Sequence, residues 1–181
     1  ANASGNENAA VGRTALDAHS AASYNTAGGY RAGNLATGAI NSDFGAQTGE
    51  NTTTGTENLG AGGSALYTNT TGSYNTAIGR AALVSNTTAS YNTAVGYQAG
   101  NSNSTGQVNT AIGYQALYSN TTASDNDAHG DRALYNNTTG PFNLGMGGQS
   151  LYHNTTASSN TAGGYKSLYA NTSPGNTAVG N

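Results

Sequence analysis

One short stretch of the chain groups side chains that could bind a metal ion. Asp127, His129 and Asp131 alternate with Ala128 and Gly130. Alternating residues of a strand point to the same face, so two carboxylates and one imidazole would lie together. Both are common metal ligands. Repeated around a threefold axis, Asp127, His129 and Asp131 could supply the ligands of a metal site. The alternative is that this stretch is only a drifted copy of a repeated sequence.

A second group has the triplet spacing of N-glycosylation acceptors. Seven asparagines at one position of a repeated sequence each begin an Asn-x-Ser/Thr triplet, and in a secreted eukaryotic protein such residues can carry glycans. They are Asn69, Asn86, Asn103, Asn120, Asn137, Asn154 and Asn171. Stacked asparagines can also form ladders of amide hydrogen bonds. Such a ladder explains why asparagine recurs at these positions without any glycan, and we expect the ladder here.

The remaining polar residues show no pattern of an active site. His19 and His153 are isolated, the other carboxylates are scattered, and the glycines do not form a phosphate-binding loop. We therefore expect no enzymatic activity and no cofactor. The formal net charge of −3 disfavours nucleic acid and an acidic membrane as partners. No apolar run approaches the ~20 residues of a membrane span, and no cysteine is present to form disulfides.

The elements that hold these residues follow from an internal repeat of seventeen residues. The stretch 75–79, Asn-Thr-Ala-Ile-Gly, returns at 92–96 as Asn-Thr-Ala-Val-Gly, and two steps along the chain are sixteen instead of seventeen residues. Residues at the same position of successive repeats form a column. We expect the asparagine and glycine columns of this stretch to be structural ladders, together with the column of Asn69 described above. Their members include Asn75, Asn92, Asn109, Asn160, Gly79, Gly96, Gly113, Gly164, Asn69, Asn86, Asn120 and Asn154.

A unit of this length predicts an all-β fold, a parallel β-solenoid or β-roll. Asn, Thr and Gly are poor helix formers, whereas Thr, Ile, Val and Tyr favour strands. Seventeen residues can close a coil of two short strands and two turns, which we place near 76–79 and 82–84. Residues 1–181 then form a single array of about ten to eleven coils, expected to be a segment of a longer fibre.

The repeat columns also predict which side chains form the core. We expect Ile78, Val95 and Ile112 to pack inside together with the leucine column of Leu66 and Leu83. The repeat position of Ala77 carries small residues, which would let the backbone of another chain approach closely. Three aromatic columns exceed what a narrow roll can bury, so at least one should lie outside. This thin core and the aromatic columns predict a parallel homotrimer or a larger bundle.

The repeat resembles those of known surface proteins. Its Asn-Thr-Ala-[Ile/Val]-Gly unit is similar to the head repeat of trimeric autotransporter adhesins. The longer unit, with Ala-Leu-Tyr-x-Asn-Thr-Thr-Gly, is similar to repeats of phage tail-fibre-like and bacterial surface proteins. The resemblance covers almost the whole chain. It implies three parallel, left-handed β-rolls around a common axis, with structural roles for residues 75–79 and their equivalents.

The expected function is that of a structural and adhesive fibre segment. The resemblance places it outside the cell, on a bacterial surface or a virion, attached to a host or another surface through a receptor or glycan. A subunit of an extracellular filament, stacked end to end, is the main alternative. An ice-binding solenoid is a third, because Thr70, Thr87, Thr121, Thr138 and Thr155 form one threonine column.

Overall fold

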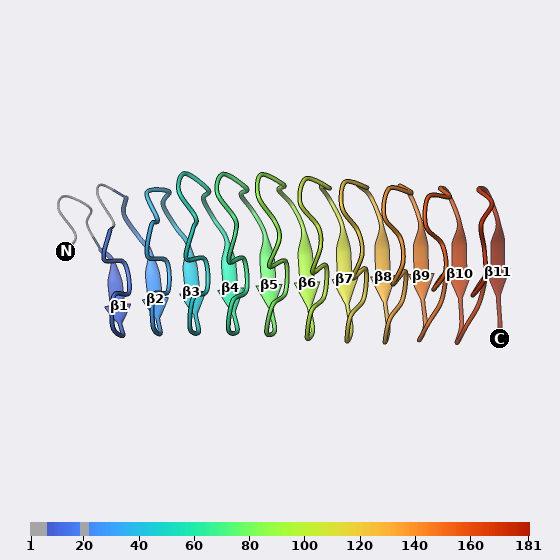
Figure 1. Ribbon diagram of the computed structural model, residues 1–181, viewed down its shortest axis with the longest axis horizontal. Coiled ribbons are helices and arrows are strands. Elements are labelled where there is room, and N and C mark those ends of the chain that lie inside the picture. Colours follow the sequence, from blue (N-terminus) through green and yellow to red (C-terminus); the bar gives the residue numbers. More distant parts are fainter. Residues whose placement is uncertain (1–6, 19–21) are drawn as a thin grey trace.

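The computed structural model describes residues 7–18 and 22–181, which form a parallel β-solenoid. Eleven strands of three residues each lie side by side in chain order in one parallel sheet (Figure 1). The described residues contain no helix. The predicted parallel β-solenoid with seventeen-residue spacing is thereby confirmed. The strands are β1 (Ala9–Val11), β2 (Thr26–Gly28), β3 (Ser42–Phe44), β4 (Leu59–Ala61), β5 (Thr76–Ile78), β6 (Thr93–Val95), β7 (Thr110–Ile112), β8 (Asp127–His129), β9 (Leu144–Met146), β10 (Thr161–Gly163) and β11 (Thr177–Val179).

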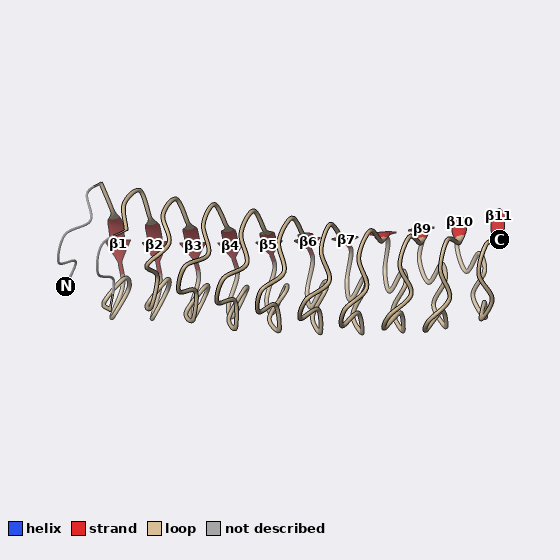
Figure 2. Cartoon of the chain, turned by 90° about the horizontal axis from the view of Figure 1, so that it is seen from above, coloured by secondary structure: helices blue, strands red, loops and turns tan. Residues whose placement is uncertain are grey.

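Each strand pairs with its equivalent in the next coil, which keeps the repeat in register along the rod. Thr76 pairs with Thr93 and Ile78 with Val95. The sixteen-residue steps preserve this register, because Thr26 still pairs with Ser42. Figure 2 shows the strands in one row along the rod, with the wound turns of each coil below them.

The prediction of two strands per coil is wrong, because the second segment adopts a left-handed backbone. Ala81 and Leu83 have φ angles of 57° and 49°, so residues 80–85 form successive turns instead of an extended strand. The segment still bonds between coils: the Leu83 amide donates to the Ala99 carbonyl at 3.0 Å. Left-handed φ costs roughly 1–2 kcal/mol for a residue with a Cβ, and burial of the leucine offsets this cost. Glycine adopts it freely, which accounts for Gly100 in the same column.

The glycine column of the repeat lies where the chain leaves each strand. Gly79 has a φ of 129°, and Gly96, Gly113 and Gly164 have φ angles between 125° and 140°. A Cβ at Gly79 would collide with the carbonyl oxygen of Gly96 in the next coil. Both the backbone angle and the close approach therefore require glycine at this corner.

The core consists of leucine and alanine, and the isoleucine part of the predicted core is wrong. Leu66 and Leu83 are at most 2% exposed, whereas Ile78 and Ile112 are 39% exposed. Successive strand residues face opposite sides. Ala77, in the middle of its strand, faces inward, so the flanking Thr76 and Ile78 face solvent. Ala77 packs against the leucine column of its own chain and offers no surface to another backbone.

The apolar core is divided into two clusters. The larger one runs from Ala65 to Ala162, and the smaller one contains Leu16, Ala27, Ala32 and Ala36. The coil of β3 lies between them and contributes no residue to either cluster, so the apolar core is interrupted there.

Candidate interaction surface

The predicted metal ligands do not form a metal site. Asp127 and His129 both leave the outer face of β8, on either side of the buried Ala128. Gly130 has a φ of 135° and turns the chain away before Asp131. No three His, Cys, Asp or Glu side chains lie close enough to hold a metal ion anywhere in residues 7–18 and 22–181. The single coil therefore does not bring Asp127, His129 and Asp131 together.

The first asparagine column forms a continuous ladder inside the rod. Asn75 Oδ1 accepts the backbone amide of Asn92 at 3.0 Å, and Asn92 Oδ1 accepts that of Asn109 at 2.9 Å. The same bond links Asn160 to Asn143 at 3.0 Å. These five asparagines are at most 4% exposed. Buried amides are stable only when hydrogen-bonded, so each asparagine depends on the coils above and below it.

The second asparagine column is equally buried, and its members bond from coil to coil between side chains. Asn86 Nδ2 donates to Asn69 Oδ1 at 2.9 Å, and Asn120 Nδ2 donates to Asn103 Oδ1 at 2.8 Å. Asn154 continues the column through Asn137 Oδ1 at 3.0 Å. Asn69, Asn86, Asn120 and Asn154 are all 0% exposed. A glycan on any of these nitrogens is incompatible with the folded coil.

Three aromatic columns lie on the outside of the rod, so tyrosine is the main side chain offered to a partner. Tyr74 and Tyr91 are 46% and 57% exposed, and Tyr97 and Tyr114 in the second column are 37% and 44% exposed. The third column, which includes Tyr135, is half-buried. Burial raises the pKa of Tyr135, and the phenols of Tyr118 and Tyr152 add to the effect. The Glu57 carboxylate raises the pKa of Tyr74. Both phenols are therefore neutral at physiological pH.

Within these columns, neighbouring tyrosines stack face to face along the rod. The ring centroids of Tyr74 and Tyr91 are 5.0 Å apart and their planes differ by 3°. Those of Tyr97 and Tyr114 are 5.5 Å apart. Because the faces are turned toward each other, the stacks present ring edges and hydroxyl groups to solvent. Basic side chains pack beside them, with Arg132 Cζ 5.3 Å from the centre of the Tyr114 ring.

The threonine column proposed for ice binding has its hydroxyl groups already engaged. Thr70 Oγ1 donates to the Thr87 carbonyl at 3.0 Å, and Thr121 Oγ1 donates to the Thr138 carbonyl at 3.1 Å. Each bond crosses to the next coil. The hydroxyl hydrogens of this column thus stabilise the stack and are not directed at a ligand.

An acidic residue interrupts the core in the third coil. Asp43 takes the position of Ala27 and Gly60 in the inner column of the sheet and is 3% exposed. Side chains at Gly33 or Gly49 would meet its carboxyl group, and these glycines stand where other coils have leucine. Burial raises the pKa of Asp43 to about 8. Sequence reasoning missed this site, although an aspartate in an alanine column beside two glycines in a leucine column would have indicated it.

An ion pair between a buried carboxylate and an exposed arginine lies in the same region. Glu50, which is 4% exposed, contacts Arg31 Nη2 through Oε1 at 3.1 Å. Its Oε2 is buried without a hydrogen-bond partner in the described residues, as is Oδ1 of Asn34. The third coil therefore carries two buried carboxyl groups in a rod that otherwise has few charges.

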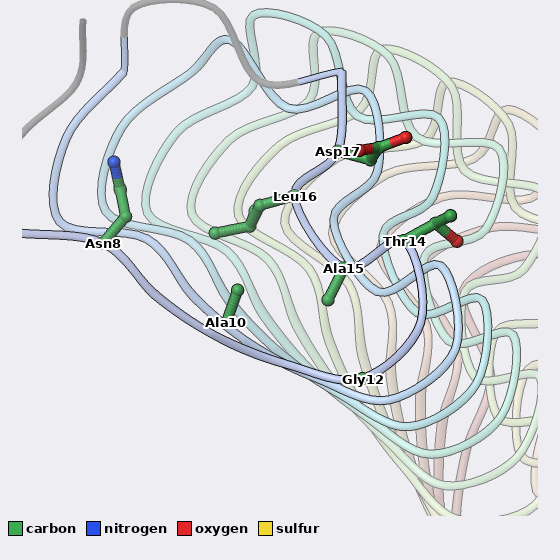
Figure 3. Close-up of a pocket in the computed structure, with 7 residues that line it drawn as sticks. All are labelled: Asn8, Ala10, Gly12, Thr14, Ala15, Leu16 and Asp17. Carbon is green, nitrogen blue, oxygen red and sulfur yellow. The ribbon is translucent and has the colours of Figure 1, made fainter. Parts of the chain in front are cut away.

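A hollow of about 360 Å³ lies at the first coil. Figure 3 shows Asn8, Ala10 and Leu16 pointing into it, whereas Thr14 and Asp17 point away. Ala10 pairs with the buried Ala27 in the sheet. The hollow is thus lined by residues of the inner alanine and leucine columns, which in the other coils are covered by the next coil. The hollow is therefore the inner surface of the first coil, and its lining residues do not form a cluster of polar side chains that point into it.

Comparisons with family models, with curated proteins and with solved structures found no match. In the part of the chain that the structure describes, no helix is long and apolar enough to cross a membrane.

Proposed function

We propose that this chain is a non-enzymatic segment of an extracellular fibre, on a bacterial cell or a virion, that attaches to a host or another surface. The observation that carries the proposal is the repetition of solvent-facing aromatic side chains along a rod in constant register. Tyr74 and Tyr91 place equivalent groups in successive coils. Equivalent contacts in series add up to avidity, even where each one is weak.

We further propose that the working species is a parallel homotrimer that associates through the outer face of the sheet. The third residue of several strands is apolar and exposed: Phe44 is 48%, Ile78 and Ile112 are 39%, and Met146 is 53% exposed. A parallel second copy in the same register would meet this stripe with its own identical stripe. Burial of such a stripe along a whole rod favours association.

Adhesion can be tested with fluorescent beads coated with the full chain. Beads are applied to bacterial cells, animal cells and an array of immobilised glycans. Matched beads carry a variant in which Tyr74, Tyr91, Tyr97 and Tyr114 are replaced by serine, with its fold checked by circular dichroism. We expect adherence to at least one of these surfaces, reduced at least tenfold by the replacement. Adherence no greater than that of bare beads on every surface would reject the adhesive role.

The oligomer is tested separately by sedimentation equilibrium at several concentrations. We expect a mass of three 18.0 kDa chains. The double variant Ile78→Asp, Ile112→Asp should become monomeric and stay folded, whereas Thr88→Asp, Thr122→Asp on the exposed loop side should stay trimeric. A folded monomer of the unchanged protein at micromolar concentration would contradict the trimer. Electron microscopy separates discrete rods from end-to-end filaments, and an ice-recrystallisation assay tests ice binding.

A further inference from the structure

Eight of the twelve tyrosines form stacks that follow the rod axis. Two stacks are pairs and one is a run of four rings. The members are Tyr74 with Tyr91, Tyr97 with Tyr114, and Tyr118, Tyr135, Tyr152 and Tyr169 in order. Partners in each stack are seventeen residues apart, so every stack joins successive coils.

The run of four rings is the longest of the three stacks. The centroid of Tyr135 lies 5.1 Å from those of both Tyr118 and Tyr152, with planes inclined by 7° and 5°. Tyr152 and Tyr169 follow at 5.3 Å. The His153 ring packs edge-on against the last two rings, at 4.8 Å and 4.9 Å. The ring carbons of one tyrosine thus lie next to those of another, held there by the inter-coil ladder.

We propose that these stacks are sites of oxidative coupling, at which a one-electron oxidant of the peroxidase class joins tyrosines of successive coils as dityrosine. The chain has no cysteine, so disulfides cannot link its coils. Each of two phenols loses one electron and one proton to become a tyrosyl radical. The radicals form one carbon–carbon bond between ring positions ortho to oxygen. The two ortho hydrogens then return to the oxygens as the rings become aromatic again. One hydrogen peroxide accepts the two electrons and two protons and becomes two waters.

Proximity decides which tyrosines react with each other. A partner held at stacking distance has an effective concentration far above that of a second molecule in dilute solution. Exposure alone predicts a different outcome. Tyr24 and Tyr165 are 58% and 53% exposed, more than Tyr97 at 37%, yet neither stacks on another tyrosine in residues 7–18 and 22–181. Coupling controlled by the stacks therefore joins residues within one chain, whereas coupling controlled by exposure joins separate molecules through Tyr24 and Tyr165.

The experiment treats the full chain at low micromolar concentration with a peroxidase and limiting hydrogen peroxide. Dityrosine is measured by its fluorescence, and linked peptides are identified by mass spectrometry after trypsin digestion. Cleavage after Arg132 and Lys166 separates Tyr152 from Tyr169, in peptides 133–166 and 167–181. A mixture of ¹⁵N-labelled and unlabelled protein distinguishes links within a chain from links between chains.

We expect the 133–166 and 167–181 peptides to be joined with uniform labelling. Tyr152→Phe keeps the ring stack and removes the reactive phenol, so this link should disappear. Tyr165→Phe, the matched control with an exposed unstacked ring, should leave the link between Tyr152 and Tyr169 unchanged. Three outcomes would overturn the proposal: links that carry mixed labels, links that mainly involve Tyr24 or Tyr165, or an equal yield of the Tyr152–Tyr169 link from protein unfolded in urea.

Discussion

Asn75 and Asn86 donate their side-chain amides to the same acceptor, the carbonyl oxygen of Ala89, at 2.9 Å and 3.0 Å. The pattern recurs one coil earlier, where Asn58 and Asn69 share the Gly72 carbonyl at 2.9 Å and 3.0 Å. The two asparagine columns are therefore not independent ladders. They meet at one carbonyl in five coils, that of Gly72, Ala89, Gly106, Ala123 or Ala157, and connect the two ends of the loop from the inside.

The first prediction concerns the loss of one amide from this network. Asn92 Oδ1 accepts the backbone amide of Asn109, and its Nδ2 donates to the Gly106 carbonyl. Asn92→Ala leaves the backbone amide of Asn109 buried and unpaired and removes one of the two donors to the Gly106 carbonyl, which keeps Asn103 Nδ2. We therefore expect the free energy of unfolding to fall by about 1–3 kcal/mol. Urea unfolding followed by circular dichroism measures it. Thr88→Ala, on the exposed loop, should change it by no more than ~0.5 kcal/mol. Equal effects would contradict the role of the ladder.

A second prediction separates the inner and outer columns. Leu117 is 1% exposed and Ile112 is 39% exposed. Leu117→Ala should lower the free energy of unfolding by about 2–5 kcal/mol, because it opens a cavity in a core with few large side chains. Ile112→Ala should cost less than ~1 kcal/mol in a single rod. Unfolding is measured at several protein concentrations, since association through Ile112 would add a concentration-dependent part. A larger loss at Ile112 than at Leu117, independent of concentration, would reverse the assignment of the two columns.

The corner glycines give a third prediction. Gly79→Ala places a methyl group against the Gly96 carbonyl at a φ of 129°, and should lower the free energy of unfolding by more than ~3 kcal/mol or prevent folding. Gly63→Ala is the control, because the nearest atom to its new methyl group is 3.9 Å away. That change should be neutral or stabilising by up to ~1 kcal/mol, through the lower entropy of the unfolded chain. Thermal melts of the two variants should separate widely, and similar melts would argue against the required backbone geometry.

Asp43 makes stability depend on pH. Its folded pKa is about 8, against 3.8 in an unfolded chain. Between these values the folded state keeps a proton that the unfolded state has released. Stability should therefore fall as pH rises from about 4 to about 8, by up to ~1.4 kcal/mol per pH unit, and become level above that range.

The matched variant is Asp43→Asn, which keeps the shape of the side chain and does not ionise. Melting temperatures of both proteins are compared at pH 5 and pH 8. The unchanged protein should melt higher at pH 5, and the variant should lose most of that difference. A pH dependence that is the same in both proteins would place its origin elsewhere, and the ion pair of Glu50 with Arg31 is then the next group to test.

The sequence predicted the solenoid, its register and the corner glycines, because a strict repeat places identical residues at identical positions. It did not predict the left-handed turn segment. Leu83 and Ala81 are ordinary residues for an extended strand, and only the occasional glycine in the leucine column, such as Gly100, indicated a positive φ. The inner and outer faces were assigned incorrectly for Ile78, because its hydrophobicity suggested burial while Ala77 takes the inward position.

The surface was predicted less completely than the fold. The exposed aromatic columns followed from the small volume of the coil. Their stacking distances and the shared carbonyl of Ala89 depend on side-chain directions that a repeat alone does not give. Asp127, His129 and Asp131 do not come together within one chain, because alternation along a strand does not continue past the corner at Gly130.

The interruption of the core at Asp43 has a consequence for how the rod assembles from an extended chain. Every coil is a template for the next, so folding can start at one nucleus and grow coil by coil in both directions. The best nucleus lies in the larger apolar cluster, between Ala65 and Ala162. Growth toward the N-terminus then reaches the coil of β3, which offers the Asp43 carboxyl group and Gly49 in place of an alanine and a leucine, and next the coil of β2, which has Gly33 in the leucine column. The growing front should pause there, and the smaller cluster around Leu16 should order last.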